Sequence, residues 1–141
     1  ISIIGTGAMG MSIVAYLSVF DDVKAIYWKG SEVGRSTQEL KGVSKLLNRL
    51  IRKKSYDKTT ALKKIHTIDT YEEIVSVDLI IEAVSEDISI KEDVFKKIAG
   101  IVSEETVIAS NTSSLSITQG PAIKNNGLSK PASKSHNFMF F

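Results

Sequence analysis

The chain has 141 residues, of which 43% are hydrophobic, and its formal net charge is +2 at pH 7. This is the length of one domain that can bury a core, and the absence of a run of about 18 apolar residues excludes a membrane-spanning helix. The small charge argues against a general nucleic-acid surface, and the lack of cysteine excludes disulfides, a Cys-based zinc site and a thiol nucleophile, which fits a cytoplasmic protein.

Short apolar runs alternate with longer amphipathic stretches along the chain. We predict strands at 1–4, 23–28, 79–84 and 107–109, and helices from the glycines near 10 to residue 20, at 32–54, at 57–65 and at 88–102. This alternation predicts a Rossmann-type, doubly wound α/β domain with a mostly parallel sheet and a helical hairpin inserted after the second strand. Because the chain opens inside a predicted strand without Met and closes on an apolar tail, we expect residues 1–141 to be one dinucleotide-binding domain of a longer protein.

Glycines follow the first predicted strand in the pattern Gly5-x-Gly7-x-x-Gly10. The pattern alone is weak evidence, but here it leaves a strand and opens a helix inside a strand-helix-strand unit, which is the context of a dinucleotide fingerprint. Gly5 would make the tight turn, Gly7 would let the backbone approach the pyrophosphate, and Gly10 would let helix and strand pack closely. The first helix would then present its N–H groups to the phosphates.

The acidic residue that usually binds the adenine ribose is missing from the end of the second strand. Gly30 stands near that position and Glu32 is the nearest carboxylate. Lys29, Ser31 and Arg35 could instead meet a ribose 2′-phosphate, so NADP stays open beside NAD.

Hydroxyl groups crowd the stretch SNTSSLSIT, residues 110–118, directly after the last predicted strand. A Ser/Thr-rich turn explains such a stretch without any ligand. In an open parallel sheet, however, ligands bind beyond the carboxyl ends of the strands, so the same side chains could line a site.

The motifs GTGAMG, DLIIEAVSEDISIKEDVF and IASNTSSLSIT, in this order and at these separations, resemble the N-terminal NAD-binding domain of the 3-hydroxyacyl-CoA dehydrogenase family. The resemblance covers nearly the whole chain, and its second and third motifs are much more specific than the first. It implies an NAD-dependent oxidoreductase of fatty-acid metabolism and beta-oxidation, which interconverts an L-3-hydroxyacyl-CoA and the 3-oxoacyl-CoA. It also implies a homodimer in which a separate helical C-terminal domain, absent from these residues, completes the site.

The resemblance implies roles for individual positions. Glu86 and Lys91 match the residues that contact cofactor and substrate, Ser113 and Asn111 match the catalytic serine and its neighbouring asparagine, and Lys53 matches a basic residue that meets the CoA phosphate. The hydroxyl that accompanies this basic residue in parts of the family falls on Leu46. We expect further cofactor contacts at Ala8, Met9, Gly30 and Ala83, and we predict no metal site.

His136 matches the catalytic histidine of the family, although the residues around it differ from the family's pattern. Loss of a hydride from an alcohol must be coupled to removal of a proton, and imidazole is a suitable base near pH 7. The family's partner glutamate lies about a dozen residues beyond the histidine, outside this chain, so we expect little or no activity from these residues alone. His66 is predicted to be structural.

We therefore predict an L-3-hydroxyacyl-CoA dehydrogenase that uses NAD, with an acyl-CoA as substrate and neither nucleic acid nor membrane as partner. Two alternatives stay open. One is a dinucleotide-binding module without catalysis, and the other is a related dehydrogenase of a different 3-hydroxy acid.

Overall fold

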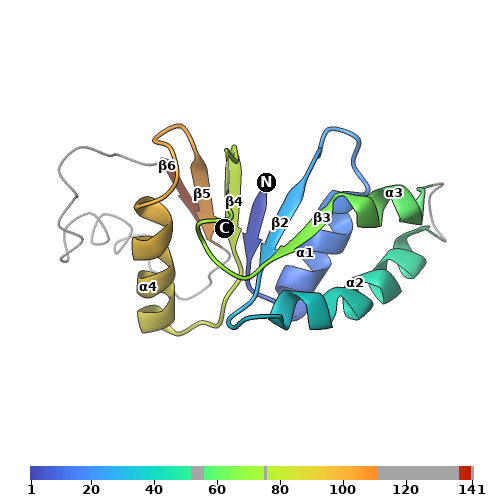
Figure 1. Ribbon diagram of the computed structural model, residues 1–141, viewed down its shortest axis with the longest axis horizontal. Coiled ribbons are helices and arrows are strands. Elements are labelled where there is room, and N and C mark those ends of the chain that lie inside the picture. Colours follow the sequence, from blue (N-terminus) through green and yellow to red (C-terminus); the bar gives the residue numbers. More distant parts are fainter. Residues whose placement is uncertain (52–55, 75, 111–136, 141) are drawn as a thin grey trace.

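A computed structural model describes residues 1–51, 56–74, 76–110 and 137–140. Within these residues the chain forms a six-stranded sheet with the order β3-β2-β1-β4-β5-β6, and all neighbouring strands are parallel (Figure 1). The predicted Rossmann-type fold is thereby confirmed. The strands are β1 (Ser2–Ile4), β2 (Ile26–Lys29), β3 (Ile65–Ile68), β4 (Leu79–Glu82), β5 (Val107–Ser110) and β6 (Asn137–Phe140).

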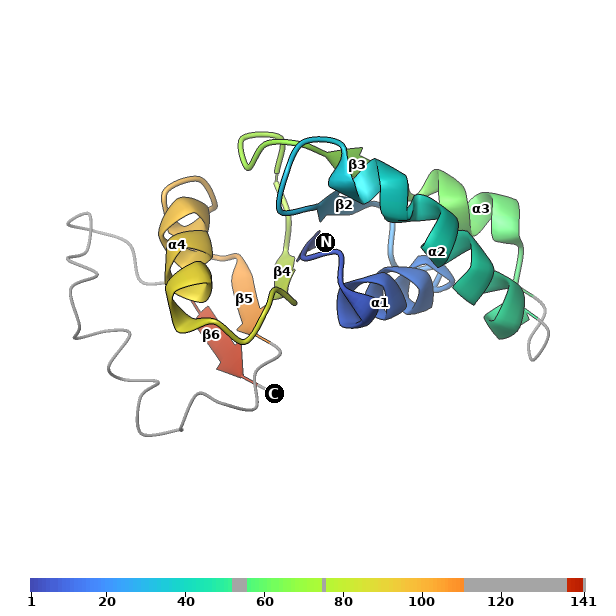
Figure 2. The ribbon, with the colours of Figure 1, turned by 90° about the horizontal axis from the view of Figure 1, so that it is seen from below.

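Helices cover both faces of the sheet, as Figure 2 shows. They are α1 (Ala8–Ser18), α2 (Arg35–Ile51), α3 (Lys58–Lys63) and α4 (Ile88–Ala99). One hydrophobic core joins α1, α2 and α3 to the first half of the sheet around the fully buried Trp28, and a second core lies beneath α4 around Ile80, Ile98 and Ile108. The apolar strands contribute side chains to both cores, because successive side chains along a strand point to opposite faces of the sheet.

Aspartates fix the starts of two helices. The carboxylate of Asp57 accepts hydrogen bonds from the backbone N–H groups of Thr59 and Thr60 at the start of α3. Asp87 does the same for Ser89 and Ile90 at the start of α4. These caps satisfy N–H groups that have no partner inside the helix. The predicted start of the short helix at residue 57 is therefore the cap of α3.

Several predicted boundaries were wrong by a few residues. The predicted helix 57–65 ends earlier, and His66 lies within β3, where its ring stacks on Tyr27 with the ring centroids 5.5 Å apart. The predicted strand 23–28 begins at Ile26, and the predicted helix 88–102 ends at Ala99. A further strand, β6, forms near the end of the chain and pairs with β5.

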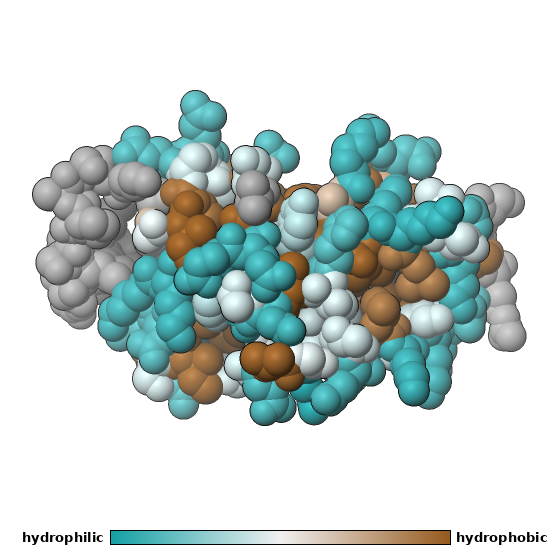
Figure 3. Space-filling model, in the orientation of Figure 1, coloured by the Kyte–Doolittle hydropathy of each residue, from teal (hydrophilic) through white to brown (hydrophobic). Residues whose placement is uncertain are grey.

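The surface in the orientation of Figure 1 is mostly hydrophilic, with hydrophobic areas scattered between the polar ones (Figure 3). Within the described residues, none of the helices is long and apolar enough to cross a membrane.

Candidate dinucleotide-binding site

The carboxyl ends of the strands form a continuous edge where the predicted site residues gather. Ile4 lies in register with Lys29 on one side and with Glu82 on the other, and Glu82 lies in register with Ser110. The sheet order reverses at β1, because the chain continues to β2 on one side and later returns to β4 on the other. Open α/β sheets bind ligands in the crevice outside such a reversal point. The lower edge of the sheet in Figure 1, seen from below in Figure 2, is this edge.

Two of the three fingerprint glycines are required by the fold itself. Gly5 has a φ of +118°, and a Cβ atom there would lie 2.2 Å from the carbonyl oxygen of Ala83. A Cβ atom on Gly10 would lie 2.1 Å from the carbonyl oxygen of Gly5. Because Gly5 and Gly10 have no side chains, β1, the first turn of α1 and the residue after β4 can lie this close together, as the predicted tight turn and close packing require.

Gly7 differs from these two glycines because neither its conformation nor its neighbours exclude a side chain. Its φ of −66° and ψ of −180° suit any residue, and no atom lies within 4 Å of the position that a Cβ atom would take. It is exposed and caps α1, whose start has no side-chain cap. Open space in front of an uncapped helix start is what a pyrophosphate would need, since the helix N-terminus offers N–H groups and a favourable dipole. Ala8 and Met9, also exposed, form the first turn beside this space.

Gly30 is buried where the second strand meets α2. A Cβ atom there would lie 2.6 Å from the Cβ atom of Arg35 and 3.0 Å from the backbone nitrogen of Ser36. The start of α2 therefore approaches the strand end so closely that the ribose-binding acid of other dinucleotide sites has no room at this position.

Lys29 is engaged by groups of the protein itself. It is buried, its Nζ atom donates a hydrogen bond of 2.9 Å to the carbonyl oxygen of Gly30, and the same atom lies 5.0 Å from the ring centroid of Tyr71. Burial lowers the pKa of Lys29 below its ordinary value, while the negative charge of Asp69 acts in the opposite direction. The buried Lys29 side chain thus stabilises the backbone at the end of β2.

Arg35 is occupied by a neighbour on its own helix. Its guanidinium forms an ion pair of 2.7 Å with Glu39, one turn further along α2. Ser31 and Glu32 are exposed in the loop between β2 and α2. The sequence offers Lys29, Ser31 and Arg35 to a 2′-phosphate. In the structure, Lys29 is buried and Arg35 is already paired with Glu39.

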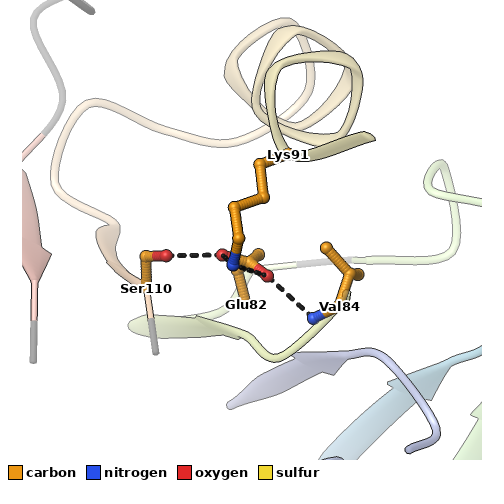
Figure 4. A network of polar contacts seen from close by, with 4 residues as sticks. All are labelled: Glu82, Val84, Lys91 and Ser110. Carbon is orange, nitrogen blue, oxygen red and sulfur yellow. Dashed lines mark hydrogen bonds and ion pairs between the residues drawn. The ribbon is translucent and has the colours of Figure 1, made fainter. Parts of the chain in front are cut away.

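The end of β4 and the start of α4 enclose a buried polar cluster (Figure 4). Glu82 is fully buried and Lys91 is 3% exposed, and the ammonium of Lys91 donates hydrogen bonds of 3.1 Å to both carboxylate oxygens. The Ser110 hydroxyl and the Val84 backbone N–H also donate to this carboxylate, at 2.5 and 2.7 Å.

The predicted contacts between β4 and α4 occupy different surroundings. Ala83 is buried against the Gly5 turn, whereas Glu86 is exposed in the loop before α4. Lys91, a predicted contact for cofactor and substrate, is buried and forms an ion pair with Glu82. The predicted contacts at Lys53, Asn111, Ser113 and His136 lie outside the described residues.

Sequence reasoning missed Glu82 as the centre of the polar cluster. The one available signal was a carboxylate inside the apolar run DLIIEAV, because a buried charge needs a partner nearby in space. Ser110 belongs to the predicted hydroxyl-rich stretch and is the part of it that the structure describes.

An apolar groove of about 670 Å³ lies between α1 and α2. Met9 stands at the end of the groove nearest the glycine turn, Leu46 and Leu50 line its α2 side, Ile81 of β4 contributes to it, and Arg49 supplies a positive charge. The groove therefore leads from the predicted cofactor site to the basic end of α2.

A family model described as "3-hydroxyacyl-CoA dehydrogenase, NAD binding domain" matches residues 1–125. The chain belongs to this family. The match includes the glycine turn, the Glu82 cluster and the hydroxyl-rich stretch, so the family resemblance of the sequence is confirmed.

Relatives in this family are moderately similar. The chain is 38% identical over 123 residues to a 3-hydroxybutyryl-CoA dehydrogenase of Clostridioides difficile, a match that covers 84% of this chain and 43% of that protein. It is 29% identical over 127 residues to the human mitochondrial hydroxyacyl-coenzyme A dehydrogenase, covering 84% of this chain and 40% of the relative. The chain therefore spans about two fifths of the length of these relatives.

Solved structures show the same fold. The (S)-3-hydroxybutyryl-CoA dehydrogenase PaaH1 of Ralstonia eutropha superimposes with a TM-score of 0.74 at 33% identity, covering 86% of this chain and 44% of the other. A lactate dehydrogenase of Eimeria maxima, at 10% identity and a TM-score of 0.59, shares the fold alone.

Proposed function

We propose that the protein is an NAD-dependent L-3-hydroxyacyl-CoA dehydrogenase, to which this chain contributes the cofactor-binding domain. The observation that carries the proposal is the open space at Gly7, in front of the uncapped start of α1 and beside the reversal point of the sheet. Gly5 and Gly10 are explained by packing, but Gly7 is not, so a ligand that approaches the backbone closely accounts for it.

The second-strand end supports NAD over NADP. A 2′-phosphate needs charge-assisted hydrogen bonds to be bound in preference to a hydroxyl. Lys29 is buried and directed to the Gly30 carbonyl, and Arg35 is paired with Glu39, while Glu32 in the adjacent loop would repel a phosphate. The ribose hydroxyls would be bound by groups of the exposed loop rather than by an acid at Gly30.

The groove between α1 and α2 supports an acyl-CoA as substrate. Its apolar lining suits the uncharged arm of such a molecule, and Arg49 at its edge, with Lys53 four residues later in the sequence, suits the phosphates. The curated relatives act on 3-hydroxybutyryl-CoA or hydroxyacyl-coenzyme A substrates according to their names.

The proposed chemistry divides between cofactor and protein. Bound NAD⁺ supplies the acceptor for the hydride from C3 of the substrate. His136 would take the proton of the 3-hydroxyl group, and Ser113 and Asn111 would orient the substrate oxygen and the cofactor. A carboxylate beyond this chain would orient the imidazole and stabilise its charged form.

Steady-state assays of the full-length protein test the proposal. We expect NADH to be consumed when acetoacetyl-CoA is added, at a rate on the order of 1 to 1000 per second. Titration with NADH and NADPH should show tighter binding of NADH. The matched substrate control is acetoacetate without CoA, which should react far more slowly because it lacks the part that occupies the groove.

Two other outcomes would replace the proposal. Tight NADH binding without turnover of any 3-oxoacyl-CoA would indicate a dinucleotide-binding module without catalysis. Equal turnover of acetoacetate and acetoacetyl-CoA would indicate a dehydrogenase of a different 3-hydroxy acid.

A further inference from the structure

Glu82 is a charged residue in the interior whose hydrogen-bonding capacity is fully used. Its carboxylate accepts two hydrogen bonds from Lys91, one from the Ser110 hydroxyl and one from the Val84 backbone N–H. Within the described residues, no buried side-chain nitrogen or oxygen lacks a hydrogen-bond partner. The cluster is therefore a complete polar network, which can hold one unique arrangement.

The donors belong to three different segments that meet only at this carboxylate. Val84 lies in the loop that leads from β4 to α4, Lys91 projects down from α4, and Ser110 is the last residue of β5 (Figure 4). The first segment carries the predicted cofactor contact Glu86. The last continues directly into the predicted contacts that begin at residue 111. Glu82 thus connects the end of β5 to the loop that carries Glu86.

Stability alone is a weak reason for an ion pair at this place. A buried ion pair gains little over apolar residues of similar size, because removing both charges from water costs about as much as their attraction returns. At the carboxyl edge of the sheet, apolar Ile4 lies in register between Lys29 and Glu82. Apolar side chains could therefore also pack at this edge in place of the ion pair. The network instead fixes the loop after β4 relative to the end of β5 at the crevice.

We propose that Glu82 is a positioning residue for the dinucleotide. Acting through Lys91, the Ser110 hydroxyl and the Val84 N–H, it fixes the loop after β4, which carries Glu86, relative to the end of β5 at the edge of the crevice. This inference rests on the proposed function, since it requires that a nicotinamide dinucleotide occupy the crevice.

A charge-neutral double variant of the full-length protein separates positioning from stability. Glu82→Gln alone leaves a buried ammonium and Lys91→Met alone leaves a buried carboxylate, so both single variants should lower the melting temperature. Glu82→Gln with Lys91→Met removes both charges at nearly constant size and should restore it. We expect the double variant still to bind NADH more weakly by about tenfold or more, which is the size of loss known for residues that orient the ligands of a metal.

Ser110→Ala provides a second test that leaves the ion pair in place. It removes the hydroxyl that ties β5 to Glu82, and we expect kcat for acetoacetyl-CoA reduction to fall by about tenfold to a hundredfold, with little change in the Kd for NADH. The matched control is Ser18→Ala, which removes a buried hydroxyl that donates to the Ala15 carbonyl oxygen at the far end of α1. Ser18→Ala should leave kcat unchanged.

The outcomes distinguish this inference from the proposed function. A double variant with wild-type melting temperature and wild-type NADH affinity, or a Ser110→Ala variant with wild-type kcat, would show that the cluster is only structural while the proposed function stands. Failure of the wild-type protein to bind NADH would overturn both.

Discussion

Gly5 and Gly7 are the same residue type in one turn, yet different physical causes act on them. Gly5 has a positive φ and lies against the Ala83 carbonyl, so any side chain there would damage the fold. Gly7 has an ordinary extended conformation and open space in front of it, so a side chain there would be accommodated in the absence of a ligand. The two positions therefore allow folding and cofactor binding to be tested separately.

Gly7→Val should leave the fold intact and weaken NADH binding by at least about tenfold, because the isopropyl group would occupy the space proposed for the pyrophosphate. Calorimetric titration of the full-length protein measures the affinity, and its melting temperature reports the fold. Gly100→Val is the matched control, since Gly100 is also exposed with an ordinary negative φ of −78° and lies at the opposite end of α4 from the site. Equal NADH affinity of the Gly7→Val and wild-type proteins would refute the proposed role of Gly7.

At the scale of the helix, the start of α4 adds a pH dependence to stability. The Ser89 hydroxyl, followed by the backbone N–H groups of Ile90 and Ser89, lowers the pKa of Asp87 below its ordinary value of 3.8. A carboxyl whose folded pKa is lowered stabilises the fold above its unfolded pKa, and this contribution is lost as the pH falls through the folded pKa. Asp87→Asn keeps a capping side chain without the charge.

The unfolding free energy of wild type minus that of Asp87→Asn should therefore be larger at about pH 6 than at about pH 3. Urea unfolding at a series of pH values measures this difference. Asp93→Asn, on the same helix, is the matched control for the loss of one negative charge. If the difference between wild type and Asp87→Asn did not change with pH, the charged form of the cap would have no part in holding α4.

The sequence predicted helices and strands better than it predicted which polar groups meet. The glycine turn was predictable because three spacings in one short segment determine it. The ion pair between Lys91 and Glu82 was not, since these residues are nine apart in sequence and meet only because α4 packs across β4. The lack of room at Gly30 was equally hidden, because it depends on how closely the start of α2 approaches. Contacts of this kind are set by tertiary packing rather than by local pattern.

At the scale of the whole molecule, one thin sheet separates two hydrophobic cores. Trp28, the single tryptophan, lies fully buried in the core beneath α1 and α2, whereas Ile98 and Ile108 lie fully buried in the core beneath α4. β1 contributes to both cores, because Ile3 faces one and Ile4 faces the other. Loss of either core should therefore disrupt the strands on which the other depends, and the two should unfold as one unit.

Ile98→Ala tests this coupling in the 141-residue chain. Truncating a fully buried isoleucine should cost about 2 to 5 kcal/mol of unfolding free energy. Although Ile98 lies on the far face of the sheet, we expect the transition seen by Trp28 fluorescence to move to lower urea concentration together with the one seen by far-UV circular dichroism. Ile90→Ala is the matched control, because Ile90 lies on the same helix and is 44% exposed, so its truncation should shift both transitions much less. If Ile98→Ala moved the circular dichroism transition and left the fluorescence transition in place, the two faces of the sheet would be separate folding units. Coupling between their unfolding would then require a ligand bound at the sheet edge.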